Sequence, residues 1–207
     1  RDFIMKDLKP TLRFNYPKHW LGEKRTNHQF IGVAHMLTHI HEIFWNRGDM
    51  ENLKMIEIGS YMGESTMMFA SSNIFTEIHC IEPFSGYEEF NDMFAINWDI
   101  VYDEFKTNTR HFDNITLHKD FSYNIADKFK NGSYDFLYID ASHEYEDVLK
   151  DINLFLPKLK SNGIIAGHDY IPEWSGLMKA VDETVGKPDR TFWDTSWIKE
   201  VDKNYFD

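Results

Sequence analysis

The chain has 207 residues, of which 42% are hydrophobic and 16% aromatic, and its formal net charge is −12. This size and apolar content suit one globular domain with a substantial core. The excess of acidic groups disfavours a nucleic-acid partner, which normally meets a basic surface. No apolar run reaches the length of about 18 residues that a membrane span requires. The single cysteine, Cys80, lies in an apolar run, which favours a buried thiol in the reducing cytoplasm.

The first 26 residues are irregular and are interpreted as an N-terminal extension, whereas residues 27–207 are expected to form a single domain. Asn27 can cap a helix, and apolar side chains recur at helical spacing from there to Phe44. Gly48 is a natural stop. We therefore expect the domain to begin with a long amphipathic helix.

Short apolar runs then alternate with helical segments, which predicts an α/β fold with a mostly parallel sheet and helices on both faces. Residues 190–201 are expected to add a C-terminal antiparallel hairpin with a tight Asp-Thr-Ser turn at the sheet edge. The strands are expected at 53–58, 77–82, 115–118, 134–139 and 163–167, and the helices at 64–73, 99–110, 122–130, 144–156 and 174–185.

Candidate binding residues follow the ends of these strands, because open parallel sheets bind ligands beyond the carboxyl ends of their strands. The first strand end provides Glu57, Gly59, Ser60 and Gly63. The glycines let the backbone approach a ligand, and the following helix offers free N–H groups. The second strand end provides Glu82, a carboxylate that suits the two hydroxyls of a ribose.

The spacing of acids and glycines distinguishes two cofactors. The pyrophosphate of a dinucleotide favours the pattern G-x-G-x-x-G without a nearby carboxylate. This chain has Glu-x-Gly-x-x-x-Gly, with the acid first. An acid there suits the cationic amine of S-adenosyl-L-methionine, and Glu82 suits its ribose. The alternative for Glu57 is an ion pair with a local cation.

A family resemblance adds to this interpretation. The segments EIGSYMGEST, CIEPFSGYEEFN, ITLHKDFS, YIDASHEYEDVLKDINLFLPKLKSNGIIAGHDY and GLMKAVDE occur in this order within residues 50–200. Together they resemble the class I S-adenosylmethionine-dependent methyltransferases, and most of all the metal-dependent sugar O-methyltransferases of macrolide biosynthesis (macrocin and mycinamicin type). The resemblance implies a Rossmann-like sheet, cofactor contacts from Glu57, Gly59, Ser60, Gly63 and Glu82, adenine contacts near Asp120 and Phe121, and a divalent metal held by Asp140 and Asp169.

The implied metal site lies at the ends of the fourth and fifth strands. Oxygen ligands suit Mg²⁺, with Mn²⁺ as the second choice, and an imidazole ligand would favour Mn²⁺, Fe²⁺ or Zn²⁺. His168 is interpreted as a third metal ligand or as a group beside one. Relatives often have Gly-Asp where this chain has Ala141-Ser142, and an acid where it has His168.

The chemistry assigned to this site is methyl transfer to a hydroxyl. His143, three residues after Asp140, is the candidate general base, and both are predicted to be catalytic. The structural alternatives are a helix cap for Asp140, a polar helix-start residue for His143, and a hydrogen-bonded loop pair for His168 and Asp169.

The leading function is therefore O-methylation of a small hydroxylated acceptor, such as a sugar-containing metabolite, by a cytoplasmic enzyme that has no membrane or nucleic-acid partner. A metal-independent methyltransferase and a catalytically silent S-adenosylmethionine-binding module are the alternatives. A nicotinamide dehydrogenase is disfavoured, because neither G-x-G-x-x-G nor a Tyr-x-x-x-Lys pair is present where it is needed. The aromatic and acidic insert at 84–105 is either core or a lid. The oligomeric state is open, with a homo-oligomer as one option.

Overall fold

The computed structural model describes residues 27–85 and 96–201. The N-terminal extension expected at 1–26 and the central part of the insert at 84–105 lie outside the described residues. None of the helices that the structure describes is long and apolar enough to cross a membrane.

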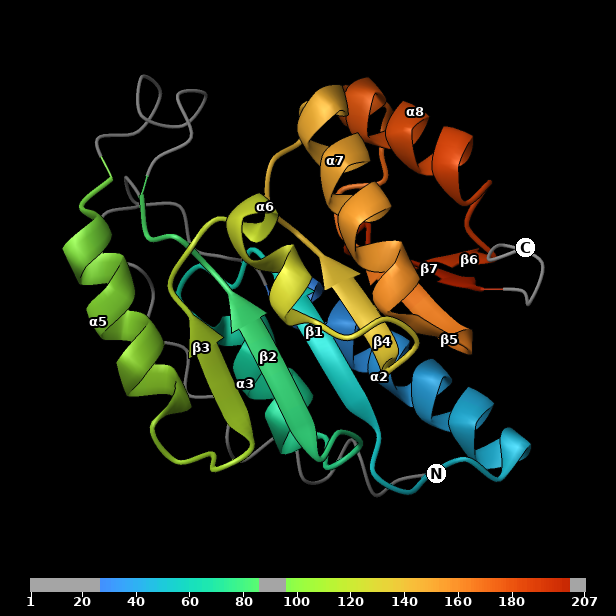
Figure 1. Ribbon diagram of the computed structural model, residues 1–207, viewed down its shortest axis with the longest axis horizontal. Helices are drawn as coiled ribbons and strands as arrows, with labels where there is room; N and C mark the ends of the chain where they lie inside the picture. Colours follow the sequence, from blue (N-terminus) through green and yellow to red (C-terminus); the bar gives the residue numbers. More distant parts are fainter. Residues whose placement is uncertain (1–26, 86–95, 202–207) are drawn as a thin grey trace.

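The centre of the molecule is a seven-stranded sheet with the order β3-β2-β1-β4-β5-β7-β6 (Figure 1). The first five strands are parallel, whereas β7 is antiparallel to both β5 and β6. This confirms the predicted sheet and its C-terminal hairpin. The strands are β1 (Lys54–Ile58), β2 (Glu77–Ile81), β3 (Ile115–His118), β4 (Tyr134–Ile139), β5 (Leu159–Gly167), β6 (Arg190–Thr191) and β7 (Trp197–Glu200).

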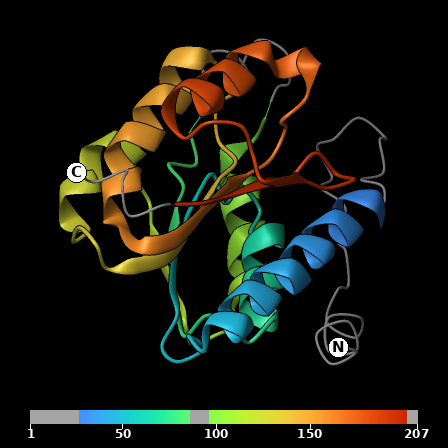
Figure 2. The same ribbon diagram turned by 90° about the vertical axis from the view of Figure 1, so that its right-hand side faces the viewer.

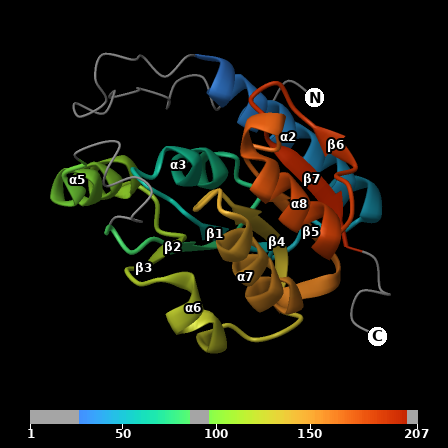
Figure 3. The ribbon, with the colours of Figure 1, turned by 90° about the horizontal axis from the view of Figure 1, so that it is seen from above.

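Helices cover both faces of the sheet (Figure 3). The core on one side includes residues of α2, α3 and α5, and the core on the other includes residues of α6, α7 and α8. The helices are α2 (Asn27–Arg47), α3 (Glu64–Ser71), α5 (Trp98–Thr109), α6 (Ser122–Ile125), α7 (Tyr145–Phe155) and α8 (Ser175–Thr184), with short 3₁₀ turns η1 (Ala126–Lys128), η2 (Leu156–Lys158) and η3 (Pro172–Trp174).

Successive side chains of β4 alternate between the two cores. Phe136 and Tyr138 belong to the core under α2 and α3, whereas Leu137 and Ile139 belong to the core under α7 and α8. All four are buried. The alternation follows from the two-residue repeat of a strand, and burial on both faces explains why β4 is apolar at every position except Asp135.

Two elements differ from the sequence expectation. The fifth strand was expected at 163–167 but begins at Leu159, which pairs with Tyr134 ahead of an irregularity in the register, and the regular pairing resumes at Ile164. The helix expected at 122–130 ends at Ile125 and continues as the 3₁₀ turn η1. Polar, partly exposed residues hid the start of β5, since the hydrophobic pattern reports only the buried part.

The sheet order creates a switch point between β1 and β4. Chain connections leave β1 toward β2 on one side, while β4 pairs with β1 on the other. Ligands of open α/β sheets bind at such a point. The β6–β7 hairpin adds a further wall, because its turn lies beside the end of β5 and reaches the N-terminal part of α2 (Figure 2).

Candidate active site

Glu57 lies on β1 and is completely buried. Its carboxylate accepts hydrogen bonds from the hydroxyls of Ser60, Ser65 and Thr66, and the thiol of Cys80 lies 3.5 Å from it. Burial raises the pKa of Glu57, while these donors act in the opposite direction. The carboxylate therefore ties the end of β1 to the first turns of α3 without a cation. Contact with the cofactor amine stays a prediction.

The glycines of the loop after β1 allow other segments of the protein to pack closely against its backbone. A Cβ on Gly59 would lie 2.1 Å from the carbonyl oxygen of Asp140, and the φ of Gly59 is 86°. Gly63 precedes α3 with a φ of 76°, and its Cβ would lie 2.9 Å from the Phe105 ring. The absence of side chains thus lets the end of β1 pack directly on the end of β4, which brings the two halves of the site together.

Glu82 follows β2 and is only 6% exposed. Its two carboxylate oxygens accept hydrogen bonds from the backbone N–H of Tyr61 at 2.9 Å and of Phe84 at 3.0 Å. Burial raises the pKa of Glu82 to about 7, although both N–H donors lower it. Each oxygen keeps a further acceptor position, so a ribose with two hydroxyls is a ligand that this carboxylate can bind.

Asp120 and Phe121 lie at the start of α6, after the end of β3. The carboxylate of Asp120 accepts hydrogen bonds from the backbone N–H of Phe121 and from the side chain of Asn124, both at 2.8 Å. These bonds lower the pKa of Asp120. The Phe121 ring stacks on Tyr123, with 5.3 Å between ring centroids. The pair fixes the loop predicted to contact the adenine.

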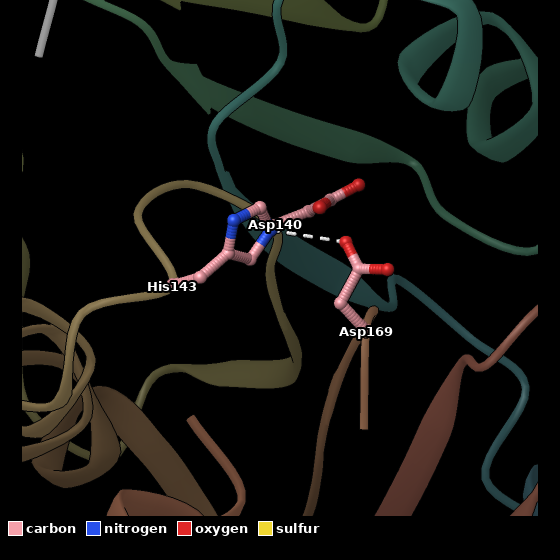
Figure 4. A group of neighbouring side chains, drawn as sticks. All are labelled: Asp140, His143 and Asp169. Atoms are coloured by element: carbon pink, nitrogen blue, oxygen red, sulfur yellow. Dashed lines mark hydrogen bonds and ion pairs between the residues drawn. The ribbon is translucent and has the colours of Figure 1, made fainter. Parts of the chain in front are cut away.

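Asp140, His143 and Asp169 form a compact group at the ends of β4 and β5 (Figure 4). One ligand atom from each residue lies within 4.8 Å of the other two. The Nε2 atom of His143 lies 3.0 Å from Oδ2 of Asp169. All three side chains are partly buried. The group joins two residues predicted to hold a metal with the residue predicted to be the base.

Asp169 is held in an uncommon backbone conformation, with a φ of 59°. The hairpin turn stabilises it, because the N–H of Asp169 donates to Oγ1 of Thr195 at 3.1 Å and this hydroxyl also lies 3.3 Å from Oδ1 of Asp169. The N–H of Tyr170 donates to the carbonyl of Thr195. Sequence reasoning missed Thr195, which has a φ of 74° itself, since only the β5–β7 pairing brings it to the site.

His168 lies outside this three-residue group. Its Nδ1 is 3.1 Å from Oδ2 of Asp169, and its Nε2 is 3.8 Å from the buried carboxylate of Asp194. Burial alone would lower the pKa of His168, but the carboxylates of Asp169, Asp140 and Asp194 outweigh it and raise the pKa to about 9. His168 therefore supplies positive charge to the cluster. Its role as a metal ligand stays a prediction.

The histidines also act on Asp169. Burial alone would raise the pKa of its carboxyl group, but the contacts with His143 and His168 hold the pKa well below its usual range. Asp169 is consequently anionic and lies between two imidazoles. A carboxylate that is ionised and partly exposed is available to a cation.

A family model confirms the class of this protein. The model of the family described as methyltransferase domain matches residues 56–170, from β1 through the group that contains Asp140 and Asp169. The chain belongs to this methyltransferase family. A protein of Acanthamoeba polyphaga mimivirus, called uncharacterized protein R132, is 29% identical over 165 residues, which are 75% of this chain and 70% of that protein.

Solved methyltransferase structures share the fold at low sequence identity. The O-methyltransferase NovP has a TM-score of 0.64 and 14% identity, with 97% of both chains covered. CalS11, described as a TDP-rhamnose 3′-O-methyltransferase of calicheamicin biosynthesis, has a TM-score of 0.57 and 13% identity, and 96% of this methyltransferase and 93% of CalS11 are covered. These likenesses confirm the Rossmann-like architecture expected from the sequence.

Proposed function

We propose that this methyltransferase transfers the methyl group of S-adenosylmethionine to a hydroxyl of a small, sugar-containing or otherwise hydroxylated metabolite, with the help of a divalent cation. The observation that carries the proposal is the group of Asp140, His143 and Asp169 at the switch point of a methyltransferase sheet. The structural likeness to CalS11, a sugar O-methyltransferase by its description, supports the choice of acceptor.

The donor atoms of the group suit a divalent cation. Two carboxylates and one imidazole nitrogen converge within 4.8 Å, and oxygen-rich sets of this kind favour Mg²⁺ or Mn²⁺. Asp140 and Asp169 would hold the ion. When bound, S-adenosylmethionine supplies an electrophilic methyl group, and a divalent cation lowers the pKa of a hydroxyl that contacts it.

His143 is proposed to take the proton of the acceptor hydroxyl. Its Nε2 lies 3.0 Å from Asp169, so the imidazolium that forms is stabilised by a neighbouring carboxylate. The other contribution of the protein is positioning, because a methyl group on a sulfonium is already activated and the protein has to align the two reactants. Glu82 is proposed to hold the ribose, so that the reacting methyl group faces the group of three.

A metal-independent methyltransferase is the second candidate. It is favoured by the His143–Asp169 contact, which can activate a base without a cation. A cytoplasmic location belongs to the proposal as well, supported by Cys80, which is a free and completely buried thiol.

Calorimetry tests the cofactor first. S-adenosylmethionine should bind to the wild-type protein and NAD should not. Glu82→Ala removes a charged acceptor of two ribose hydroxyls, and bonds to charged groups contribute roughly 1.5–3 kcal/mol, so the affinity should fall at least about tenfold. Asp127→Ala, at an acid in η1, is the matched control. Unchanged affinity in a folded Glu82→Ala protein would remove the ribose assignment.

A labelled-methyl screen tests the reaction. Glycosides and other vicinal diols are incubated with methyl-labelled S-adenosylmethionine in the presence of Mg²⁺, Mn²⁺ or a chelator. Label should enter a hydroxylated product only when a divalent cation is present. Turnover that survives the chelator would favour the metal-independent candidate, and binding of S-adenosylmethionine without transfer to any acceptor would favour a silent module.

A further inference from the structure

The indole ring of Trp174 covers one face of the His143 imidazole. The two ring centroids are 4.2 Å apart and the ring planes differ by 23°, which is a stacked arrangement. Other histidines contact aromatic rings less closely or edge-on. The centroid distance is 6.1 Å between His41 and Trp45, and the His79 ring meets Phe129 at 83°. The stack on His143 is therefore a close contact of two flat faces.

The two rings come from different elements. His143 lies in the loop between β4 and α7, whereas Trp174 ends η3, directly before α8. The backbone N–H of Trp174 donates to the carbonyl of Ile171 at 3.0 Å, and its side chain packs on the core under α7 and α8. The indole is thus fixed by its own segment, independently of the imidazole.

Backbone packing keeps the two segments in contact. A Cβ on Gly176 would lie 3.1 Å from the backbone nitrogen of Tyr145 and 3.3 Å from the carbonyl oxygen of His143. The start of α8 therefore rests directly on the loop that carries His143. Such close packing tolerates little displacement of the two segments. The position of Trp174 relative to the imidazole is therefore fixed.

The stack and the contact with Asp169 restrain different motions of the ring. The torsion that turns an imidazole about its bond to Cβ is broad, so a single hydrogen bond at Nε2 leaves the ring plane poorly defined. The bond to Asp169 fixes the direction of Nε2, at 3.0 Å, and the flat face of Trp174 fixes the plane. Together they fix both the direction and the plane of the imidazole beside Asp140 and Asp169.

We propose that Trp174 is a positioning residue, whose indole face holds the His143 imidazole in the plane in which it contacts Asp169 and takes the proton of the acceptor. The inference rests on the proposed function of the Asp140, His143 and Asp169 group. Trp174 itself does not contact the reacting atoms in this proposal, and it acts through His143 alone.

Nuclear magnetic resonance of the metal-free protein tests the stack without any acceptor. With isotope-labelled histidine, and with His143→Gln to assign the signal, the ring protons of His143 should be shifted upfield by the indole. Trp174→Leu should abolish this shift while keeping an apolar side chain, and Trp174→Phe should retain part of it. Trp45→Leu, at a tryptophan that is 67% exposed on α2, is the matched control. A His143 signal that is identical in wild type and Trp174→Leu would overturn the stacking role.

Mn²⁺ binding and kinetics test the consequence. Because partners that orient a metal ligand typically change affinity by 10–100-fold, and His143 contacts Asp169, Trp174→Leu should weaken Mn²⁺ binding about tenfold, and Trp174→Phe should restore most of it. In the labelled-methyl assay kcat should fall, while KM for S-adenosylmethionine and the melting temperature without metal should stay near wild type.

The outcomes separate this inference from the proposed function. Equal losses of Mn²⁺ affinity, S-adenosylmethionine affinity and melting temperature in both Trp174 variants would show a merely structural role and overturn the inference. A wild-type protein that binds no Mn²⁺ would refute the metal part of the proposed function, and the resonance experiment would then decide the role of Trp174 alone. Normal Mn²⁺ affinity in Trp174→Leu would also overturn the inference.

Discussion

The two pairs of acids at the strand ends have opposite surroundings. Glu57 and Glu82 are buried and are contacted by neutral donors, namely hydroxyls, a thiol and backbone N–H groups. Asp140 and Asp169 are partly exposed and share their space with His143 and His168. One half of the site is thus held by uncharged hydrogen bonds, and the other by charge.

The pKa values follow this division. Burial raises the pKa of both Glu57 and Glu82, whereas the histidines hold the pKa of Asp169 well below its usual range. A buried acid with neutral partners is suited to bind neutral groups such as ribose hydroxyls, whereas ionised acids close together are suited to a cation. The comparison shows that the surroundings of an acidic residue, and not its type alone, indicate whether it suits a neutral cofactor group or a metal ion.

The largest loss of turnover should come from a substitution in the charged half of the site, which contains Asp140, Asp169, His143 and His168. His143→Ala removes the proposed base, and loss of a general base typically lowers turnover about 10²–10⁴-fold. The affinity for S-adenosylmethionine should remain near that of the wild type, because Glu82 is untouched. Steady-state kinetics and calorimetry measure the two quantities. Turnover within a few-fold of wild type would show that another group or water takes the proton.

The charged half should also account for any stabilisation by metal. At about 100 times its dissociation constant, a bound ion adds about 2.7 kcal/mol to the free energy of unfolding. Mg²⁺ or Mn²⁺ should raise the melting temperature of the wild type, and the variant with both Asp140→Asn and Asp169→Asn should lose this response. Glu146→Gln, at an exposed acid of α7, should keep it. An unchanged response in the double variant would place the ion elsewhere.

A substitution of Glu57, in the neutral half, should lower the free energy of unfolding more than it lowers the affinity for the cofactor. Glu57→Gln leaves three hydroxyl donors with one amide oxygen, and a buried donor without an acceptor costs about 1–3 kcal/mol. Urea unfolding should show a loss in this range, with a smaller change in cofactor affinity. Full stability combined with a large loss of affinity would instead support direct contact between Glu57 and the cofactor amine.

The smallest expected effect is a pH dependence of the cofactor affinity that comes from the titration of Glu82. Its pKa rises from 4.5 to about 7 in the folded chain. The folded state therefore binds this proton more tightly than the unfolded state, and its contribution to stability is lost as the pH rises from 4.5 through 7. Since the ionised form is the better acceptor for ribose, the affinity for S-adenosylmethionine should rise up to about tenfold between about pH 6 and pH 8.

Glu82→Gln provides the comparison for this experiment. The variant should bind more weakly and without the rise through pH 7, because an amide does not titrate. Calorimetry at several pH values measures both curves. Parallel curves for the two proteins would assign the pH dependence to another group, and the first to examine is Asp151, a buried acid of α7 whose pKa is raised to about 6 by burial.

Much of this arrangement was predictable because it depends on buried strands. Mostly apolar runs such as 134–139 mark strands that are covered on both faces, and the carboxyl ends of these parallel strands meet at one edge of the sheet. That reasoning brought Asp140 and Asp169 together from positions 29 residues apart in the sequence. It also located Glu57 and Glu82 on adjacent strands.

The partners of these acids were not predictable, since they depend on local backbone angles and tertiary contacts. Asp169 has a positive φ and is held by the hydroxyl of Thr195, which comes from the hairpin turn. Trp174 and Thr195 reach the site only through the packing of α8 and the pairing of β7. No spacing in the sequence encodes such contacts.

The hairpin turn at Thr195 implies an order in which the site matures during synthesis. The neutral half draws its acids from residues 57 and 82, whereas Asp169 is held by a hydroxyl that lies 26 residues further along the chain. Glu82 and its two donors, Tyr61 and Phe84, precede Thr195 by more than 100 residues, so they leave the ribosome much earlier. A ribosome-bound chain that has exposed β1 and β2 can therefore form the surroundings of Glu82 early, but the charged half has to wait until the last two strands have emerged and paired.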